Sequence, residues 1–235
     1  MACNVFGKPV RGESRLDRAL KALEDTNLGG KRDQAIQYVK HQQLKAGAQG
    51  GLVCTLTIFY NATGETLFYA EDHSKYGKIY DSYPARVHNG QWGAFLHIKR
   101  SVAPTGSEGF VVYRGKCNNT DFCKQLIAWD VPVNQAHFDN HAYCDIYADD
   151  WDINKDKVYK RMEAGSKQHT TTKKGMVVTS SIDEGICPLY EAQFTLDEDD
   201  ANGGTFKGPG AAPTPSIFPL DNTVLSVFCQ KNIFF

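Results

Sequence analysis

The sequence has no apolar run near the roughly 20 residues that a membrane-spanning helix needs, and no apolar segment follows its polar start. Its formal net charge is −1, so no overall field attracts nucleic acid or an anionic membrane. It also lacks the Gly-x-Ser-x-Gly elbow and the Cys-x-x-Cys pair that mark hydrolases and redox enzymes. These absences predict a cytoplasmic protein without a transmembrane span, a nucleic-acid partner or a cofactor.

The cysteines do not form a disulfide framework. There are seven of them, an odd number, and Cys117 and Cys123 are six residues apart, which is too far for a local redox motif. We therefore expect most of them to be thiols, as in a reducing compartment. Hydrophobic residues make up 41% of the chain and charged residues 23%, which is the composition of an ordinary soluble globular protein.

The first part of the chain predicts helices. Leu16, Ala19, Leu20 and Leu23 recur at helical spacing, and a second apolar series continues to residue 46 after the break at LGG. Ser14 is placed to cap the first helix, with Asp17 three positions later, and Gly29-Gly30 is placed to end it. We assign residues 1–50 to an N-terminal helical region.

From Leu52 the apolar period changes to two, which indicates strands. Short segments rich in β-branched and aromatic residues recur between turn residues: LVCTLTIFY, WGAFLHIK, GFVVYR, QLIAWDV, AYCDIYA, GMVVTSSI, LYEAQFTL and TVLSVFC. NATGE is expected to be a hairpin turn, DKVYKRMEAG a short helix, and residues 197–222 a long flexible loop. The pattern predicts a mainly β protein, with residues 51–235 forming an antiparallel β-sandwich domain.

The glycine-rich stretch APTGSEGFVVYRG, residues 103–115, is not a phosphate-binding loop. Its glycines precede a strand rather than a helix, no Lys follows them, and Glu108 would repel a phosphate. We interpret it as a turn that Glu108 braces, followed by a strand with Phe110 and Val112 on one face and Val111 and Tyr113 on the other.

Two segments suggest metal ligands. In HFDNHAYCD, the side chains of His137, Asp139 and His141 would share one face of a strand, and two imidazoles with a carboxylate suit zinc. A solvent-facing polar strand end is the alternative. DINKDKVYKRME matches several positions of a calcium loop, but Lys157 stands where the sharp turn needs Gly, so we interpret it as a polar loop before a charged helix.

An aromatic and basic stretch, KYGKIYDSYP, predicts a ligand-binding patch. Aromatic rings suit a membrane interface or a quaternary ammonium group, and Lys or Arg suits phosphate. Packing of the tyrosines into the sandwich is the alternative interpretation. The candidate ligand-binding residues are Tyr76, Tyr80, Tyr83, Trp92, Lys75, Lys78 and Arg86.

The order of these motifs resembles the aegerolysin family. The matching segments are NATGETL, YGKIYDSYP, PTGSEGFVVY, IAWDVPVN and NHAYCDIY, within roughly residues 52–148. The resemblance implies a β-sandwich that recognises membrane lipids. Through VFGKP, the N-terminal helical region and NGQWGAFLH, the whole chain is more similar still to the plant jasmonate-induced proteins of the twenty-three-kilodalton class. That resemblance implies a cytosolic stress and defence protein without enzymatic activity.

We therefore expect a non-enzymatic plant defence protein that binds a lipid headgroup or a glycan at its sandwich loops. In a membrane-active version, the apolar stripe of the first helix would insert into the bilayer; packing of that stripe on the sandwich is the simpler interpretation. Two alternatives stay open: a metal-dependent enzyme that uses His137, Asp139 and His141, and a structural stress protein that self-associates into homo-oligomers.

Overall fold

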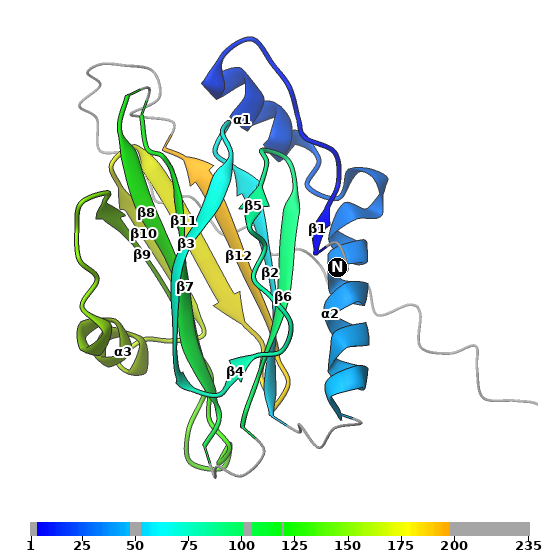
Figure 1. Ribbon diagram of the computed structural model, residues 1–235, viewed down its shortest axis with the longest axis vertical. Helices are drawn as coiled ribbons and strands as arrows, with labels where there is room; N and C mark the ends of the chain where they lie inside the picture. The colour runs from blue at the N-terminus through cyan, green and yellow to red at the C-terminus, as the bar shows by residue number, and fades with distance from the viewer. Residues whose placement is uncertain (1–3, 48–52, 101–104, 119, 198–235) are drawn as a thin grey trace, which may run out of the picture. The chain divides into compact units, whose positions relative to one another are not determined.

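The computed structural model describes residues 4–47, 53–100, 105–118 and 120–197 (Figure 1). Contacts divide the chain into two units, Met1–Gly204 and Thr205–Phe235, and all described residues belong to the first unit. The predicted loop near 197–222 (apart from Asp197), the predicted strand TVLSVFC, and residues Cys3 and Cys229 lie outside the described residues.

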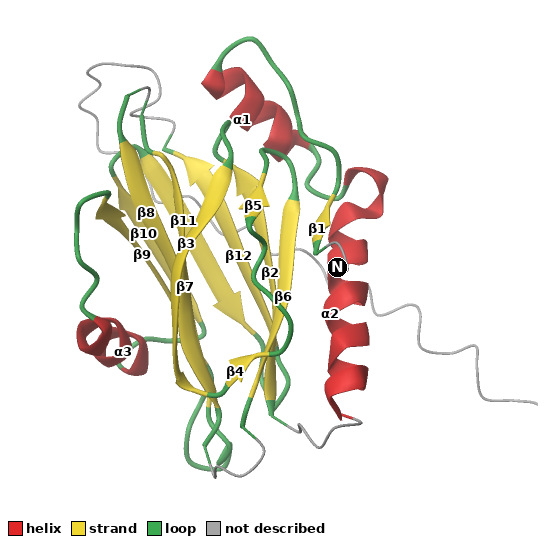
Figure 2. Ribbon diagram, in the orientation of Figure 1, coloured by secondary structure: helices red, strands yellow, loops and turns green. Residues whose placement is uncertain are grey.

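Two sheets packed face to face form the body of this unit, with helices against their outer sides (Figure 2). Sheet A contains, in spatial order, β1 (Val5–Phe6), β6 (Trp92–Ile98), β2 (Cys54–Ala62), β12 (Leu189–Leu196), β11 (Met176–Ile182) and β10 (Gln168–Lys173), and β4 (Lys78–Ile79) also pairs with β6. Sheet B contains β5 (Arg86–Val87), β3 (Leu67–Tyr76), β7 (Ser107–Lys116), β8 (Phe122–Val131) and β9 (His141–Ala148). The mainly β sandwich predicted from the sequence is confirmed.

Within the described residues, every strand pair is antiparallel except β12 with β2. These two strands run parallel, with Leu189 opposite Leu56 and Thr195 opposite Ala62. The pair joins the C-terminal strands β10–β12 to the first long strand of the sheet. A parallel pair cannot be closed by a short turn, so the sequence around either strand carries no local mark of it.

The NATGE turn does not make a hairpin. It joins β2 of sheet A to β3 of sheet B, so the chain crosses from one layer of the sandwich to the other. The segment after β6 crosses in the same way, because β7 belongs to sheet B. The predicted hairpin at NATGE is therefore wrong, although the turn itself is present. Gly and Asn residues permit a tight reversal, but they do not specify which sheet the next strand joins.

The core between the sheets is built from large aromatic and β-branched side chains. Both sheets contribute to it, and its largest fully buried members are Phe59, Phe95, Tyr113, Trp129, Tyr190 and Phe194. The predicted alternation in β7 is confirmed: Val111 and Tyr113 face this core, whereas Phe110 and Val112 face the other side of sheet B. In β2 all nine residues are buried, because the outer face of sheet A is covered as well.

Helices α1 (Arg15–Glu24) and α2 (Lys31–Gly47) cover that outer face, as Figure 1 shows for α2 beside β6 and β2. The side chain of Ser14 accepts the Asp17 backbone N–H, so the predicted cap is confirmed. Gly29 and Gly30 do not end the first helix; they lie in the 3₁₀ turn Leu28–Gly30 before α2. No helix among the described residues is long and apolar enough to cross a membrane.

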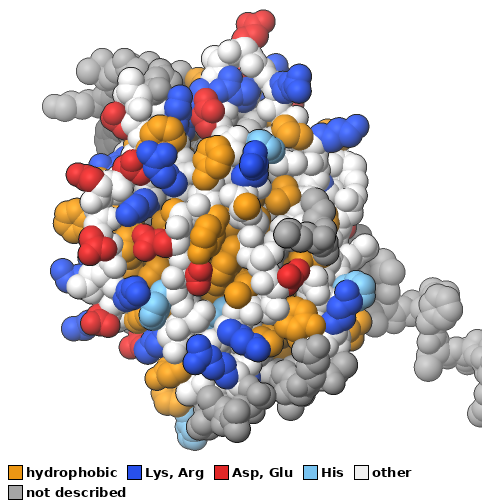
Figure 3. Space-filling model, in the orientation of Figure 1, with side chains coloured by type: hydrophobic (Ala, Val, Ile, Leu, Met, Phe, Trp, Pro, Cys, Tyr) orange, Lys and Arg blue, Asp and Glu red, His pale blue; other side chains and the backbone are white. Residues whose placement is uncertain are grey.

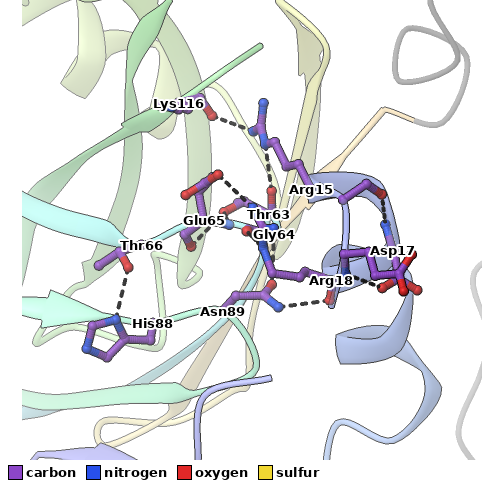
Figure 4. A network of polar contacts seen from close by, with 12 residues as sticks. Arg15, Asp17, Arg18, Thr63, Gly64, Glu65, Thr66, His88, Asn89 and Lys116 are labelled. Atoms are coloured by element: carbon purple, nitrogen blue, oxygen red, sulfur yellow. Dashed lines mark hydrogen bonds and ion pairs between the residues drawn. The ribbon is translucent and has the colours of Figure 1, made fainter. Parts of the chain in front are cut away.

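Polar contacts hold α1 on the turn between β2 and β3 (Figure 4). The Nε atoms of Arg15 and Arg18 donate to the carbonyl oxygens of Thr63 (3.0 Å) and Gly64 (2.7 Å). The turn requires glycine at position 64, where φ is 75° and a Cβ would lie 2.2 Å from the Arg15 carbonyl oxygen. In the predicted apolar stripe of this helix, Ala19 is buried whereas Leu20 is 43% exposed, so part of the stripe packs on the sandwich.

The outer face of sheet B carries one short helix, α3 (Lys155–Glu163), at the position predicted from DKVYKRMEAG. The side chain of Asn154 caps its first turn by accepting the Lys157 backbone N–H at 3.0 Å. Val158, Tyr159 and Met162 bury themselves against Phe110, Val112, Leu126, Ala128 and Tyr143 of the sheet. This nine-residue helix covers less of its sheet than α1 and α2 cover of sheet A.

Candidate functional site

The predicted aromatic and basic patch does not assemble as one surface. Trp92 is 2% exposed, and its Nε1–H donates to the Thr26 carbonyl oxygen at 2.7 Å. Its ring packs on Tyr60 beneath the N-terminal helices. Tyr80 is half-buried against the same cluster. Trp92 is thus removed from the surface, and Tyr80 is only partly exposed.

The other tyrosines of the stretch also separate. Tyr83 is half-buried against the core between the sheets, and its ring stacks on Tyr69 with centroids 5.8 Å apart. Tyr76, at the end of β3, is 42% exposed. Packing therefore accounts for three of the four predicted aromatic residues, because rings in an alternating strand region fill the core before they line a site.

The predicted basic residues lie on different strands. Lys78 in β4 belongs to sheet A and Arg86 in β5 belongs to sheet B, and both are exposed. The ammonium group of Lys75 lies between two carboxylates, 3.1 Å from Glu108 and 2.6 Å from Glu163. Lys75 is thus already neutralised and is not available to hold a phosphate.

The three predicted metal ligands are not brought together. His137 and Asp139 lie in the loop before β9, which starts at His141, so the expected common strand face does not form. The His141 Nδ1 atom lies 3.5 Å from a carboxylate oxygen of Asp130, and Asp139 is exposed beside Lys167. No group of three His, Cys, Asp or Glu side chains in the described part of the chain has the arrangement that would hold a metal ion.

A buried carboxylate, Glu108, and a partly buried one, Asp130, lie side by side on the outer face of sheet B. Glu108 is 3% exposed and stands opposite Asp130 across β7 and β8. Burial, together with the charge of Asp130, raises the pKa of Glu108 to about 7 despite the hydrogen bond from Lys75. The side chain of Glu108 accepts a hydrogen bond from Lys75 of the neighbouring strand. Part of the preceding turn, residues 101–104, lies outside the described residues, so the predicted role of Glu108 as a brace for that turn stays a prediction.

A cavity of about 660 Å³ lies where α3 begins, beside the end of β9 and the turn between β10 and β11. We call it the α3 pocket and define it by the side chains that its chemistry uses: Asp145, Tyr147, Trp151, Lys157, Arg161, Lys173 and Lys174. The remaining charged residue of its lining is Asp152. Four cations and two carboxylates therefore line one concave surface together with two aromatic rings.

Asp145 organises the floor of the α3 pocket. Its side chain is 1% exposed and forms ion pairs with Arg161 (3.1 Å) and Lys173, while the Tyr143 hydroxyl donates to it at 2.9 Å. Burial alone would raise the pKa of Asp145, but the hydrogen bonds from Lys173 and the Ile146 backbone N–H hold it below its ordinary value. The carboxylate thus stays charged and fixes two cations in place.

The rim of the α3 pocket contains an exposed tryptophan and two lysines that form no ion pair with a described residue. Trp151 is 57% exposed in the connection between β9 and α3. Among the described residues, neither Lys157 nor Lys174 takes part in an ion pair, and both are exposed. Lys174 is also the one described non-glycine residue with a positive φ, 56°, in its turn with Gly175. Backbone strain of this kind is concentrated at functional positions.

Figure 3 shows charged side chains of both signs around hydrophobic ones on the side of the molecule where α3 lies. The sequence predicted a polar loop and a short charged helix after residue 151, but it did not identify them or the KKG turn as part of a site. Two features of the sequence could have indicated the site. A Trp among polar residues precedes the Lys- and Arg-rich segment DKVYKRME, and a basic pair, KK, precedes a glycine in a turn. Their convergence depends on the pairing of β9, β10 and β11 in space.

A larger cavity of about 1,100 Å³ adjoins the α3 pocket and shares Ala148 and Lys174 with it. Its lining contains Asp121, Asp149 and Asp150 against two cations, Lys174 and Arg15. The guanidinium group of Arg15 is already used, because its Nη2 donates to the Lys116 carbonyl oxygen at 2.5 Å. The balance of charge therefore makes the α3 pocket the better site for an anionic group.

Comparison with known proteins supports one family. The 23 kDa jasmonate-induced protein of barley (Hordeum vulgare) is 38% identical over 146 residues, which cover 56% of this chain and 68% of that protein. A jasmonate-induced protein homolog of Atriplex canescens is 28% identical over 103 residues, covering 43% of this chain and about half of the relative.

Among solved structures, the lipid binding protein Nakanori has the same fold. It matches with a TM-score of 0.67 at 23% sequence identity, over 77% of this chain and 88% of that protein. The family model of the Nakanori-like proteins matches residues 3–197, a range that includes both described sheets and the helices α1, α2 and α3. This chain belongs to the Nakanori-like family and is a relative of the 23 kDa jasmonate-induced protein.

Proposed function

We propose that this protein is a non-enzymatic lipid-binding protein that holds a phosphate-bearing headgroup in the α3 pocket. One observation carries the proposal: the exposed ring of Trp151 and the ammonium groups of Lys157 and Lys174, which form no ion pair among the described residues, line the same preformed cavity. Membership of the family and the description of Nakanori as a lipid binding protein support it.

Each group has a distinct part in this proposal. Lys157 and Lys174 approach the phosphate from the helix and from the turn, and charge-assisted hydrogen bonds of this kind are the stronger ones in proteins. Arg161 and Lys173 are held by Asp145, so the cavity is ordered before the ligand arrives and less entropy is lost on binding. Trp151 supplies an amphipathic ring suited to the boundary between headgroups and acyl chains.

The names of the barley and Atriplex relatives support a plant stress response as the setting, and we propose that role for this chain. We propose no catalytic role for the α3 pocket: among its described residues there is no His, Ser or Cys, and Asp145, the buried one of its two carboxylates, is held in ion pairs with Arg161 and Lys173. The proposed chemistry is therefore recognition of a charged group at a surface.

The test is flotation of the full chain with vesicles of a neutral lipid, with and without an anionic phospholipid. We expect Lys157→Glu with Lys174→Glu to lower the bound fraction at least tenfold, because two attractive charges become repulsive. The matched control is Lys40→Glu, an exposed lysine on α2, which should bind as the parent does.

A second pair of variants locates the docking surface. Trp151 follows the end of β9 and Phe138, 60% exposed, precedes its start, so the two rings mark opposite ends of one strand. Trp151→Ala should lower binding several-fold and Phe138→Ala should not. The reverse result would move the docking surface to the other end of the sandwich. Binding to a glycan panel but to no vesicle would overturn the proposal.

A further inference from the structure

Two cysteines face each other across the parallel pair β2–β12. Cys54 is the first residue of β2, and its backbone N–H donates to the Ile186 carbonyl oxygen at 2.9 Å. The Leu56 N–H donates in the same way to Pro188 at 3.0 Å. Because Leu56 stands opposite Leu189, the register extended by two residues places Cys54 opposite Cys187.

Both side chains project to the same side of sheet A. Cys54 belongs to the cluster between the sheet and the N-terminal helices, and Cys187 packs against that cluster. Neighbouring strands are about 4.8 Å apart, which lies inside the range of about 4.4–6.8 Å that a disulfide requires between Cα atoms. The two thiols already form a hydrogen bond with each other. Little movement of the backbone would be needed to join them.

The two thiols differ in reactivity. Cys54 is 1% exposed, whereas Cys187 is only partly buried. The hydrogen bond from Cys54, with a further one from the Gln43 side chain, lowers the pKa of Cys187 to about 7, although burial opposes this. The same pairing and burial raise the pKa of Cys54. The hydrogen bond therefore favours the thiolate of Cys187 over that of Cys54, and the thiolate is the nucleophile in disulfide exchange.

A second pair in the molecule provides an internal contrast. Cys117 and Cys123 lie near each other where β7 and β8 meet, and their thiols also form a hydrogen bond. Cys117 is 6% exposed and Cys123 is fully buried, and burial raises the pKa of Cys123 to about 12. The two thiols of this pair are therefore close together, but both are more deeply buried than Cys187 and the raised pKa of Cys123 disfavours its thiolate.

We propose that Cys54 and Cys187 are a redox modification site that glutathione disulfide converts to an intramolecular disulfide. The Cys187 thiolate attacks one sulfur of glutathione disulfide, forming a mixed disulfide and releasing one glutathione thiolate. Cys54 then attacks the Cys187 sulfur, its proton passes to the second departing glutathione, and the protein disulfide forms. Two electrons move from the protein thiols to glutathione disulfide, which becomes two molecules of glutathione.

The bond would fasten the end of the β11–β12 connection to β2. This connection includes Ile186, which is 45% exposed, and the parallel pair is the joint between the C-terminal strands and the rest of sheet A. Oxidation would therefore link β2 covalently to the segment before β12. We expect it to raise the melting temperature by at least about 5 °C, because the bond closes a long loop.

The experiment uses the full chain with Cys3→Ser and Cys229→Ser, which removes the thiols outside the described residues. After incubation with glutathione disulfide, remaining thiols are alkylated, and peptides are mapped by mass spectrometry without reduction. We expect a Cys54–Cys187 cross-linked peptide, the loss of two alkylatable thiols, and a rise in melting temperature that a reductant reverses. Cys187→Ser should abolish all three changes, whereas Cys123→Ser should retain them.

Three results would overturn the proposal. The first is a stable mixed disulfide of glutathione on Cys187 with Cys54 still alkylatable. The second is oxidation of Cys117 with Cys123 at an equal or faster rate. The third is no loss of thiols at a glutathione disulfide excess that oxidises an ordinary exposed dithiol peptide. Peptide mapping of the parent chain gives the answer even where a serine variant fails to fold.

Discussion

The outer faces of the two sheets differ in how completely helices cover them. On sheet A, α1 and α2 enclose a cluster of buried side chains, and every residue of β2 is buried. On sheet B, the shorter α3 encloses a smaller cluster and leaves the α3 pocket beside it, with Trp151 exposed. The difference teaches that the two faces of one sandwich can be covered to different extents, and the less covered face is the one at which we propose that a ligand binds.

Two tryptophans, Trp92 and Trp151, illustrate this contrast. Trp92, which the sequence suggested as a ligand residue, fills the covered face, and Trp151, which the sequence did not suggest, stands on the open one. We expect substitutions on the covered face to change the free energy of unfolding most and substitutions on the open face to change it least.

Truncation on the covered face should cost most. Trp92→Ala removes a ring that is 2% exposed and packs on Tyr60, so we expect a loss of about 3–5 kcal/mol in the free energy of unfolding, measured by urea denaturation. Trp92→Phe keeps a ring but loses the hydrogen bond to Thr26, and should cost less. A loss below about 1 kcal/mol for Trp92→Ala would contradict the interpretation that the covered face of sheet A contributes most to stability.

Truncation of a side chain under α3 should lower the free energy of unfolding less, because the hydrophobic cluster between α3 and sheet B is smaller than the one on sheet A. Met162 is fully buried against sheet B, and Met162→Ala should lower the free energy of unfolding by about 2–3 kcal/mol. The volume-conserving Met162→Leu serves as the control and should stay within about 1.5 kcal/mol of the parent in the same denaturation experiment. If Met162→Ala were costlier than Trp92→Ala, the ranking of the two faces would be reversed.

Glu108 should make the outer face of sheet B sensitive to pH. Its folded pKa of about 7 lies above the unfolded value of about 4.3, so the folded state holds a proton that the unfolded state has released. This stabilising contribution is present below the unfolded pKa and is lost as pH rises through the folded pKa. We expect the parent to lose about 1–2 kcal/mol relative to Glu108→Gln between pH 5 and pH 8.

The measurement is the free energy of unfolding of both chains across that pH range. His97 is buried, which lowers its pKa to about 3 and gives it the opposite pH dependence, but this contribution is common to both chains and cancels in the difference. Glu163→Gln, which leaves Glu108 in place, should retain the decline of the parent. Parallel curves for the parent and Glu108→Gln would show that Glu108 does not titrate in this range.

Substitution on the open face should barely affect stability. Trp151 is 57% exposed, so Trp151→Ala should change the free energy of unfolding by less than about 0.5 kcal/mol. The other two tryptophans, Trp92 and Trp129, are 2% and 0% exposed. A blue shift of tryptophan emission on adding anionic vesicles should therefore come from Trp151 and disappear in the variant. Persistence of the shift would place the docking surface elsewhere.

Much of the fold could be predicted because its signals are local. Ser14 caps a helix wherever its side chain reaches the Asp17 N–H, and the alternation in GFVVYR predicts a strand with two faces, as observed for Val111 and Phe110. The candidate site could not be predicted in the same way. The residue types of KYGKIYDSYP suit a ligand, but Tyr83 and Trp92 lie at positions where burial gains more free energy than exposure.

The sequence by itself determined most of the helices and strands of this protein, because helix caps, apolar periods and turn residues act over a few neighbouring positions. Its motifs also determined the relationship to the jasmonate-induced proteins. Tertiary structure alone decided that NATGE joins two sheets, that β12 runs parallel to β2, and that Cys54 lies opposite Cys187. It also decided that Trp151, Lys157 and Lys174 share one pocket. The physical reason is that packing of the sheets and helices, rather than any local pattern, brings together residues that are far apart in the chain.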